Sequence, residues 1–322
     1  MKKNTNIKKI LILILLIVTL TTGCTKTLVD KNKKAIKNPE TGQNLTENIL
    51  CKPTDKKAIK QYKKYKVDID KLPSCDNFKI NSGKYEGIWT SIFVKPLAFV
   101  ILQLGKNTGN YALALIIVTI IIRLITFPLT QKTAKQSQIM QEANPELQRI
   151  QKKYAGKQDE ESLAKQSQEM MMIYKKYNIN PLSGCLFSFI QLPLFIAFYE
   201  AVQRFPAIFE DSFLGLQLGT TPWIGFFRSN FYLYIILMLL IATTTYYSFK
   251  MNMANQPTEG SMKSMPIFMS IMIIVTALFM PSALCIYWFF NNLCTIIQNQ
   301  LVKSHSKDKI KMKGSNKKYG KA

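Results

Sequence analysis

The sequence predicts an all-α integral membrane protein with five transmembrane helices around a hydrophilic groove and a cytoplasmic helical hairpin. Of its 322 residues, 48% are hydrophobic, and they gather in runs close to the ~20 residues that a helix needs to cross the hydrocarbon core. The formal net charge of +24 lies mainly in lysines that flank these runs or fill polar tails. This pattern favours attraction to anionic lipid over the basic stripe of a nucleic-acid-binding fold, so no DNA partner is expected.

The chain begins with the features of a secretory signal peptide, predicted over residues 1–23. Four lysines precede an apolar run over residues 10–20, and three small residues then lead to Cys24. This order resembles a bacterial lipobox, which implies cleavage after Gly23 and attachment of lipid, such as palmitate, to Cys24. Thr21 departs from the pattern, which prefers leucine there. An uncleaved anchor helix with an incidental cysteine is the alternative.

Residues 24–87 are rich in Lys, Asn and Asp and contain few apolar clusters. They are therefore predicted to form an extracytoplasmic tether, with at most a short helix near residues 54–65. On the outer side of the membrane a disulfide between Cys51 and Cys75 is chemically permitted, and the sequence leaves its formation open. No metal site and no cofactor are predicted, because the only histidine is His305 and no CxxC pair exists.

Five later segments are predicted to cross the bilayer, because each is apolar over most of the required length. A preceding apolar stretch, residues 88–104, is interrupted by Lys95 and Pro96 and is instead predicted as an interfacial amphipathic helix. Spans four and five meet at Pro281, because proline ends a helix and is tolerated where the chain turns. In order, the spans cover residues 111–130, 182–205, 231–249, 265–280 and 282–302.

The placement of Lys and Arg sets the predicted orientation. Residues 131–180, read as two amphipathic helices joined around residues 155–160, hold nine basic residues. The basic tail, residues 303–322, holds eight, whereas the connection 206–228 holds one. The hairpin and the tail are therefore expected in the cytoplasm, and the lipid-anchored N-terminus outside. The lysine-rich tether is an exception that the charge rule allows, since long translocated segments are less bound by it.

Arg123 is the only charge near the centre of the five predicted spans. An arginine at that depth costs ~2.5–3.5 kcal/mol on insertion scales, so it needs water, a partner or a function. Thr119 lies one turn earlier on the same helix face. We interpret Arg123 as the charge of a hydrated groove that meets polar or acidic passing segments. The alternative is an arginine that snorkels to the interface or pairs with Glu200.

A second polar set lies in the spans that follow. Each of its members, taken singly, is expected to hydrogen-bond a neighbouring helix. Taken with Arg123 and Thr119, however, they supply enough polar surface to line a groove. The residues assigned to that groove are Gln191, Tyr287, Trp288 and Asn291, with Asn292 and Gln298 beside them.

Four long strings carry a family resemblance. They are TIIIRLITFPLTQKT, NPELQRIQKKY, YKKYNINPLSGCLFSFIQLPLFIAFY and MPSALCIYWFFNNLCTIIQNQ. Together they resemble the YidC family, bacterial relatives of the mitochondrial Oxa and chloroplast Albino insertases, over residues 88–302. The lipoprotein-type start and the small outer region look like the Gram-positive form of that family.

The resemblance implies a membrane protein insertase and chaperone rather than an enzyme. It implies a water-accessible groove, open to the cytoplasm and to lipid, with Arg123, Thr119 and Trp288 at the family's groove positions. Its expected partners are nascent membrane proteins, membrane lipids, the ribosome and the Sec translocon. Its expected location is the plasma membrane, with the C-terminus in the cytoplasm.

Three other classes compete with this interpretation. A secondary transporter is weakened by the lack of an internal repeat and of an intramembrane acid for ion coupling. A channel needs a ring of charges, which one arginine does not supply in a monomer. A membrane enzyme needs a nucleophile with a base, or a metal site, and the sequence suggests neither. For the basic tail, contact with ribosomal RNA and attraction to lipid headgroups both stay open.

Overall fold

The computed structural model describes residues 25–157, 159–180, 183–253 and 265–319. The predicted signal peptide and Cys24 lie outside the described residues. The chain divides into two compact units. The first contains the described residues up to Val118 with Gln191–Met238 and Thr276–Tyr287, and the second contains Thr119–Ile190, Leu239–Val275 and the chain from Trp288 onward.

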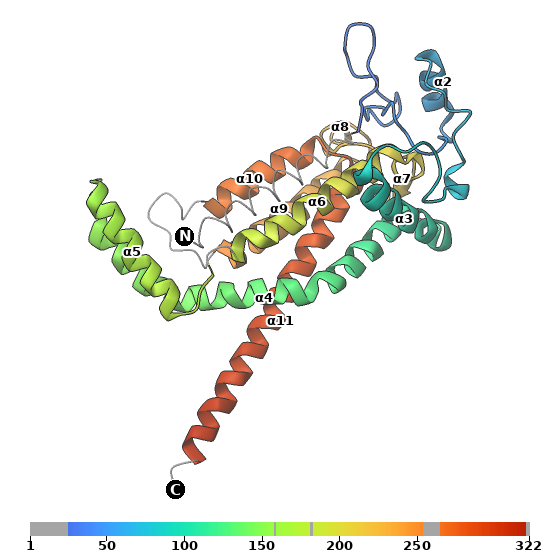
Figure 1. Ribbon diagram of the computed structural model, residues 1–322. Coiled ribbons are helices and arrows are strands. Elements are labelled where there is room, and N and C mark those ends of the chain that lie inside the picture. Colours follow the sequence, from blue (N-terminus) through green and yellow to red (C-terminus); the bar gives the residue numbers. More distant parts are fainter. Residues whose placement is uncertain (1–24, 158, 181–182, 254–264, 320–322) are drawn as a thin grey trace. The chain divides into compact units, whose positions relative to one another are not determined.

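The described chain is mainly helical (Figure 1). Its helices, in order, are α2 Lys56–Lys64, the 3₁₀ turn η1 Cys75–Asn77, the π turn η2 Thr90–Val94, α3 Lys95–Thr108, α4 Tyr111–Tyr154, α5 Glu160–Lys176, α6 Ser183–Arg204, α7 Pro206–Glu210, α8 Pro222–Gly225, α9 Phe231–Met253, α10 Met265–Leu278 and α11 Ser282–Tyr319.

One small hairpin interrupts the helices. Strands β1 Ser212–Phe213 and β2 Leu216–Gln217 pair antiparallel. The two residues between them, Leu214 and Gly215, both have positive φ, of 50° and 86°. Such a pair matches the primed turns that suit tight hairpins, because their twist agrees with that of the strands.

The N-terminal segment, residues 25–87, packs around a core of its own. Apolar side chains that stand singly among lysines in the sequence come together in this core, which contains Leu28, Leu45, Ile49, Ala58, Tyr62 and Ile69. The short helix expected near residues 54–65 is present as α2, capped by Asp55, whose carboxylate accepts from the amides of Lys57 and Ala58. Cys51 and Cys75 form a disulfide. The segment predicted as a tether with at most a short helix therefore also contains a small core and a disulfide.

Helix α4 contains both predicted span one and the first helix of the predicted hairpin. The two segments, which the sequence divides at residue 131, form one helix of 44 residues. The helix continues through Pro128 and Pro145. The side chains change from apolar to polar near residue 131. The helix continues there because its backbone hydrogen bonds do not depend on the polarity of the side chains. By length and composition, two described helices are apolar enough to cross a membrane, Tyr111–Tyr154 and Phe231–Met251, and Ile267–Leu278 is a shorter apolar helix.

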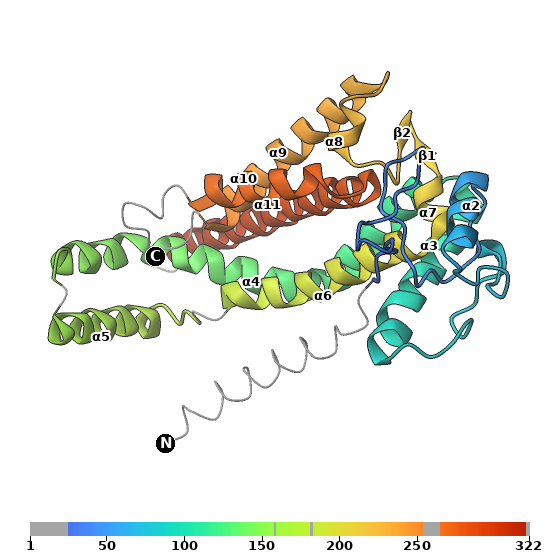
Figure 2. The ribbon, with the colours of Figure 1, turned by 90° about the horizontal axis from the view of Figure 1, so that it is seen from above.

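In the second unit, α5 runs back alongside the last part of α4 (Figure 2). The two helices share a small core in which Ala143, Leu147 and Ile179 are buried. The ends of this pair are joined by two matching sets of contacts. Glu169 accepts from Lys153 Nζ at 2.6 Å and Tyr154 Oη at 2.9 Å, while Glu146 accepts from Lys176 Nζ at 2.7 Å and Tyr177 Oη at 2.8 Å.

The turn predicted at Pro281 is present, since α10 ends at Leu278 and α11 begins at Ser282. It is held inside the first unit, where the amide of Ser282 donates to the carbonyl of Thr220 at 2.9 Å. Helix α11 then continues to Tyr319. The boundary predicted between span five and the basic tail at residue 302 is therefore not a helix end.

Candidate functional site

Arg123 lies in the α4 part of the second unit and is 4% exposed. Its Nε donates to Oδ1 of Asn291 on α11 at 2.7 Å, although 168 residues separate the two in the chain. The backbone carbonyl of Arg123 accepts from Nε2 of Gln298 at 3.1 Å. Thr119, one turn earlier on α4, is also buried. The structure thus brings together Arg123, Thr119, Asn291 and Gln298, which the sequence had suggested as parts of one polar surface.

In this cluster the guanidinium of Arg123 meets a neutral acceptor. Asn291 offers an amide oxygen, which orients one N–H of the guanidinium without cancelling its charge, and the guanidinium has five N–H donors in all. A second amide contact lies on the same helix, where Asn292 Nδ2 donates to Oγ1 of Thr245 on α9 at 2.8 Å. Sequence reasoning did not single out Thr245, because a threonine in an apolar run gives little signal by itself.

Gln191 and Tyr287 form a separate contact within the first unit. Gln191 Nε2 donates to the hydroxyl of Tyr287 at 2.9 Å. The tyrosine ring is 2% exposed and stacks on Phe198 with ring centroids 4.2 Å apart. This geometry agrees with the simpler expectation of a hydrogen bond between neighbouring helices, here α6 and α11. Trp288 follows Tyr287 on α11 and is half-buried in the second unit.

Glu200 is engaged within the first unit. One carboxylate oxygen accepts from Trp89 Nε1 at 2.9 Å, and the other lies 3.5 Å from Nη1 of Arg204. The sequence had offered Glu200 as an alternative partner for Arg123, and its observed partners are Trp89 and Arg204 instead. The spacing of Glu200 and Arg204, four residues apart on one helix, could have indicated this ion pair.

The chain is similar to a known protein family and to named members of it. The family described as "60Kd inner membrane protein" matches residues 103–309. The chain is 39% identical over 218 residues to the "Membrane protein insertase YidC" of Oceanobacillus iheyensis, covering 67% of this chain and 84% of that protein. It is 38% identical over 217 residues to the "Membrane protein insertase MisCA" of Bacillus subtilis, covering 67% and 79%.

A solved structure is also similar. Its title is "Active YidC insertase crystal structure with the first transmembrane domain resolved", and its TM-score is 0.50 at 25% sequence identity. The match covers 76% of this chain but 52% of the solved one, so this chain spans about half the length of that protein.

Proposed function

Because this chain belongs to the 60Kd inner membrane protein family, and is a membrane protein insertase as its relatives are, we propose that Arg123 is the charge that meets its substrates inside the membrane. The substrates are nascent membrane proteins. The observation that carries the proposal is the buried Arg123 guanidinium, oriented by the neutral amide of Asn291 at 2.7 Å in a predicted span.

The physical task of an insertase explains why such a charge is useful. A substrate's polar tail that crosses hydrocarbon loses its hydrogen bonds to water, and this loss raises the barrier to insertion. Polar groups within the bundle lower that barrier, because they replace part of the lost hydration. Arg123 would attract an acidic or polar tail, Asn291 would hold the guanidinium in place, and Thr119 would add a hydroxyl on the same face. The substrate's apolar segment then moves into lipid.

Gln191, Tyr287 and Trp288 complete the proposed lining of a hydrated groove. In this role the hydrogen bond between Gln191 and Tyr287 keeps two polar side chains satisfied while no substrate is present. No nucleotide-binding motif of the GxxxxGK[ST] type occurs in the sequence. The proposed driving forces are the membrane potential and the hydrophobicity of the entering segment.

The membrane arrangement is part of the same proposal. Five spans, at residues 111–130, 182–205, 231–249, 265–280 and 282–302, would leave residues 131–180 and 303–322 in the cytoplasm. The N-terminal segment would lie outside, anchored by lipid on Cys24. The apolar helices Tyr111–Tyr154 and Phe231–Met251 and the distribution of lysines support this arrangement.

The ribosome and the Sec translocon are the proposed partners in the cell. The basic tail carries eight lysines, which would give salt-dependent contact with ribosomal RNA. Truncation after Val302 is expected to lower co-sedimentation with ribosomes at low salt. Unchanged co-sedimentation would remove the ribosome contact from the proposal and would leave the insertase activity untouched.

The test of Arg123 is complementation of an insertase-depleted bacterium. Wild type, Arg123→Lys and Arg123→Ala are compared, with Arg228→Ala as a control at an arginine of the α8–α9 connection. Insertion of a short membrane protein is scored by protease protection. Wild type, Arg123→Lys and Arg228→Ala should support insertion. Arg123→Ala should lower insertion by about tenfold or more, since the charge is lost. Equal rescue by Arg123→Ala would remove Arg123 from the mechanism.

A further inference from the structure

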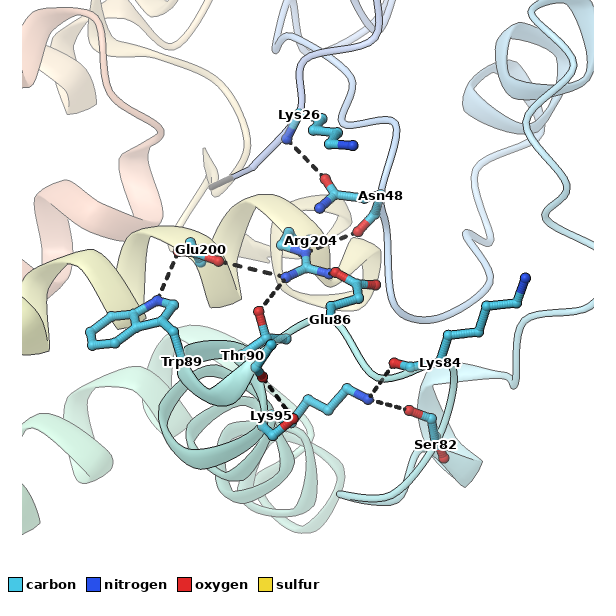
Figure 3. Close-up of polar contacts among 12 residues, drawn as sticks. Lys26, Asn48, Ser82, Lys84, Glu86, Trp89, Thr90, Lys95, Glu200 and Arg204 are labelled. Atoms are coloured by element: carbon cyan, nitrogen blue, oxygen red, sulfur yellow. Dashed lines mark hydrogen bonds and ion pairs between the residues drawn. The ribbon is translucent and has the colours of Figure 1, made fainter. Parts of the chain in front are cut away.

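The first unit contains a second buried arginine, Arg204, the last residue of α6 (Figure 3). It is fully buried and is the largest such side chain among the described residues. Its guanidinium forms an ion pair and hydrogen bond with Glu86 and lies 3.5 Å from Glu200. It also donates from Nε to the carbonyl of Asn48 at 2.9 Å and from Nη1 to the hydroxyl of Thr90 at 3.4 Å.

These contacts join parts of the chain that are far apart in the sequence. Asn48 lies next to Ile49 of the core of the N-terminal segment, 156 residues before Arg204. Its side-chain oxygen accepts from the amide of Lys26 at 2.9 Å (Figure 3), and the amide of Leu50 donates to the carbonyl of Arg204 at 2.9 Å. Both the side chain and the backbone of Arg204 therefore hold the N-terminal segment to the end of α6.

The same cluster holds one side of the helix that runs through η2 and α3. Trp89 donates to Glu200, Thr90 accepts from Arg204, and Lys95 donates from Nζ to the carbonyls of Ser82 and Lys84 at 2.6 and 3.3 Å. Trp89, Thr90 and Lys95 are all 3% exposed or less. The inward-facing polar side chains of this helix therefore hydrogen-bond either to α6 or to the loop before the helix.

The opposite side of this helix is apolar and open. Ile92 is 59% exposed and Phe93 46% exposed, and Ile88 and Val100 are exposed as well. A helix with anchored polar groups inside and exposed apolar side chains outside suits the boundary between headgroups and acyl chains. Rotation of this helix would bring the apolar side chains against the protein and the polar ones into lipid.

The charges of the cluster balance, since Arg204 and Lys95 are positive and Glu86 and Glu200 are negative. Only a planar guanidinium with five donors can meet two carboxylates, a carbonyl and a hydroxyl at once, and a lysine ammonium has three donors at a single point. The Glu200 oxygen near Nη1 lies in ion-pair range but outside hydrogen-bond geometry.

We propose that Arg204 is a positioning residue for insertion: it locks the N-terminal segment and the η2–α3 helix onto the end of α6, so that the apolar face of that helix stays in the membrane interface. The proposal rests on the insertase function and adds a role for a charge that does not meet the substrate. The N-terminal segment becomes an integral part of the insertase, because it supplies one of the acceptors of Arg204.

The test is hydrogen exchange, followed by mass spectrometry, on the full chain in lipid nanodiscs. Arg204→Lys keeps the positive charge and removes the planar guanidinium with its five donors. Arg228→Lys is the matched control. In Arg204→Lys, amides of residues 46–52 and 88–95 should exchange about tenfold faster or more, together. Amides of α2 should be unchanged, because they are held by hydrogen bonds within the helix and by its cap at Asp55. Insertion by the same preparation should fall, and Arg228→Lys should match wild type in both assays.

Two results would overturn the proposal. The first is that residues 46–52 and 88–95 of Arg204→Lys exchange at the wild-type rate. The second is that Arg204→Lys inserts substrates normally although these residues exchange faster. If Arg204→Lys does not accumulate, Glu86→Gln replaces it, since this side chain is 30% exposed and lies at the edge of the cluster. It should raise exchange in the same two regions by a smaller factor, and unchanged exchange would count against the proposal. Failure of the Arg123 test leaves these exchange results standing, so the two proposals are separable.

Discussion

Among the described residues, two buried arginines, one in each unit, differ in the contacts that the structure gives them. Arg204 contacts two carboxylates, Glu86 and Glu200, together with a carbonyl and a hydroxyl. Arg123 donates to the neutral amide of Asn291. From sequence alone the two look alike, as single arginines in or at the end of apolar helices. Their contacts distinguish them, because Arg204 is paired with carboxylates and Arg123 donates to an amide.

This difference assigns different consequences to the two charges. A buried ion pair contributes little net stability, but removal of one partner leaves the other uncompensated and costly. Arg204 is therefore expected to matter first for folding. Arg123 lies in a predicted span, where it is proposed to meet substrates, so it is expected to matter first for insertion. The predictions below break or sharpen this comparison.

The largest expected effect on stability follows from Arg204→Met. The free energy of unfolding should fall by about 3–5 kcal/mol, because Glu200 stays buried, and Glu86 half-buried, without their partner. Denaturant unfolding in detergent micelles measures this change. The triple variant that adds Glu86→Gln and Glu200→Gln should recover part of the loss. A loss below about 1 kcal/mol for Arg204→Met alone would mean that the cluster does not compensate the charge.

The next effect concerns the disulfide between Cys51 and Cys75, whose positions are 24 residues apart. Its replacement by two serines should cost about 3 kcal/mol, since a loop of this size no longer restricts the unfolded chain. The loss should be confined to the N-terminal segment and should appear as faster proteolysis at its lysines. Reduction of the wild-type protein should reproduce it. Equal proteolysis of the oxidised, reduced and serine forms would contradict the prediction.

A smaller loss of stability is expected for Arg123→Met. It removes one hydrogen bond to Asn291 and leaves a buried amide oxygen without that donor, which costs about 1–3 kcal/mol. Unfolding in the same micelles as for Arg204→Met allows a direct comparison. The comparison of the two arginines would fail if Arg123→Met lost as much stability as Arg204→Met, since Arg123 would then be a structural charge as well.

The sequence anticipated the helices better than their boundaries and partners. The structure contains three features that local sequence signals had indicated. They are the turn at Pro281, helix α2 and the burial of Arg123. The continuity of α4 did not follow, because the polar residues after residue 130 suggested a new element although a helix needs no apolar side chains. The Arg204 cluster was missed because Glu86 and Trp89 come from more than 110 residues away.

The smallest expected effect concerns pH and the contact between α4 and α5. Hydrogen bonds from Lys176 and Tyr177 hold the pKa of Glu146 below its usual 4.5, and those from Lys153 and Tyr154 do the same for Glu169. A lowered pKa in the folded state means that the stabilisation is present above the usual pKa and is lost as the pH falls through the folded value. The protection of α5 amides from exchange, compared with an unfolded chain at the same pH, should therefore fall below the usual carboxyl pKa.

A matched variant distinguishes these ion pairs from a general acid effect. In Glu146→Gln the exchange of α5 should already be raised at neutral pH, and it should respond less to acid than in wild type. Glu161→Gln is the control, because its partner Lys165 lies on the same helix and the pair does not join α5 to α4. An acid response that is the same in all three proteins would show that other groups control the packing.

The most direct test of the account is site-specific photo-crosslinking from position 291. A photoreactive amino acid replaces Asn291 in one protein and Ile297, an exposed apolar residue of the same helix, in another. Ribosomes stalled on a short membrane protein then present its polar N-terminal tail. The account predicts crosslinks from position 291 to the tail and from position 297 to lipid or to the apolar segment. Crosslinks to the tail from 297 and none from 291 would contradict the claim that substrates meet the Arg123 cluster.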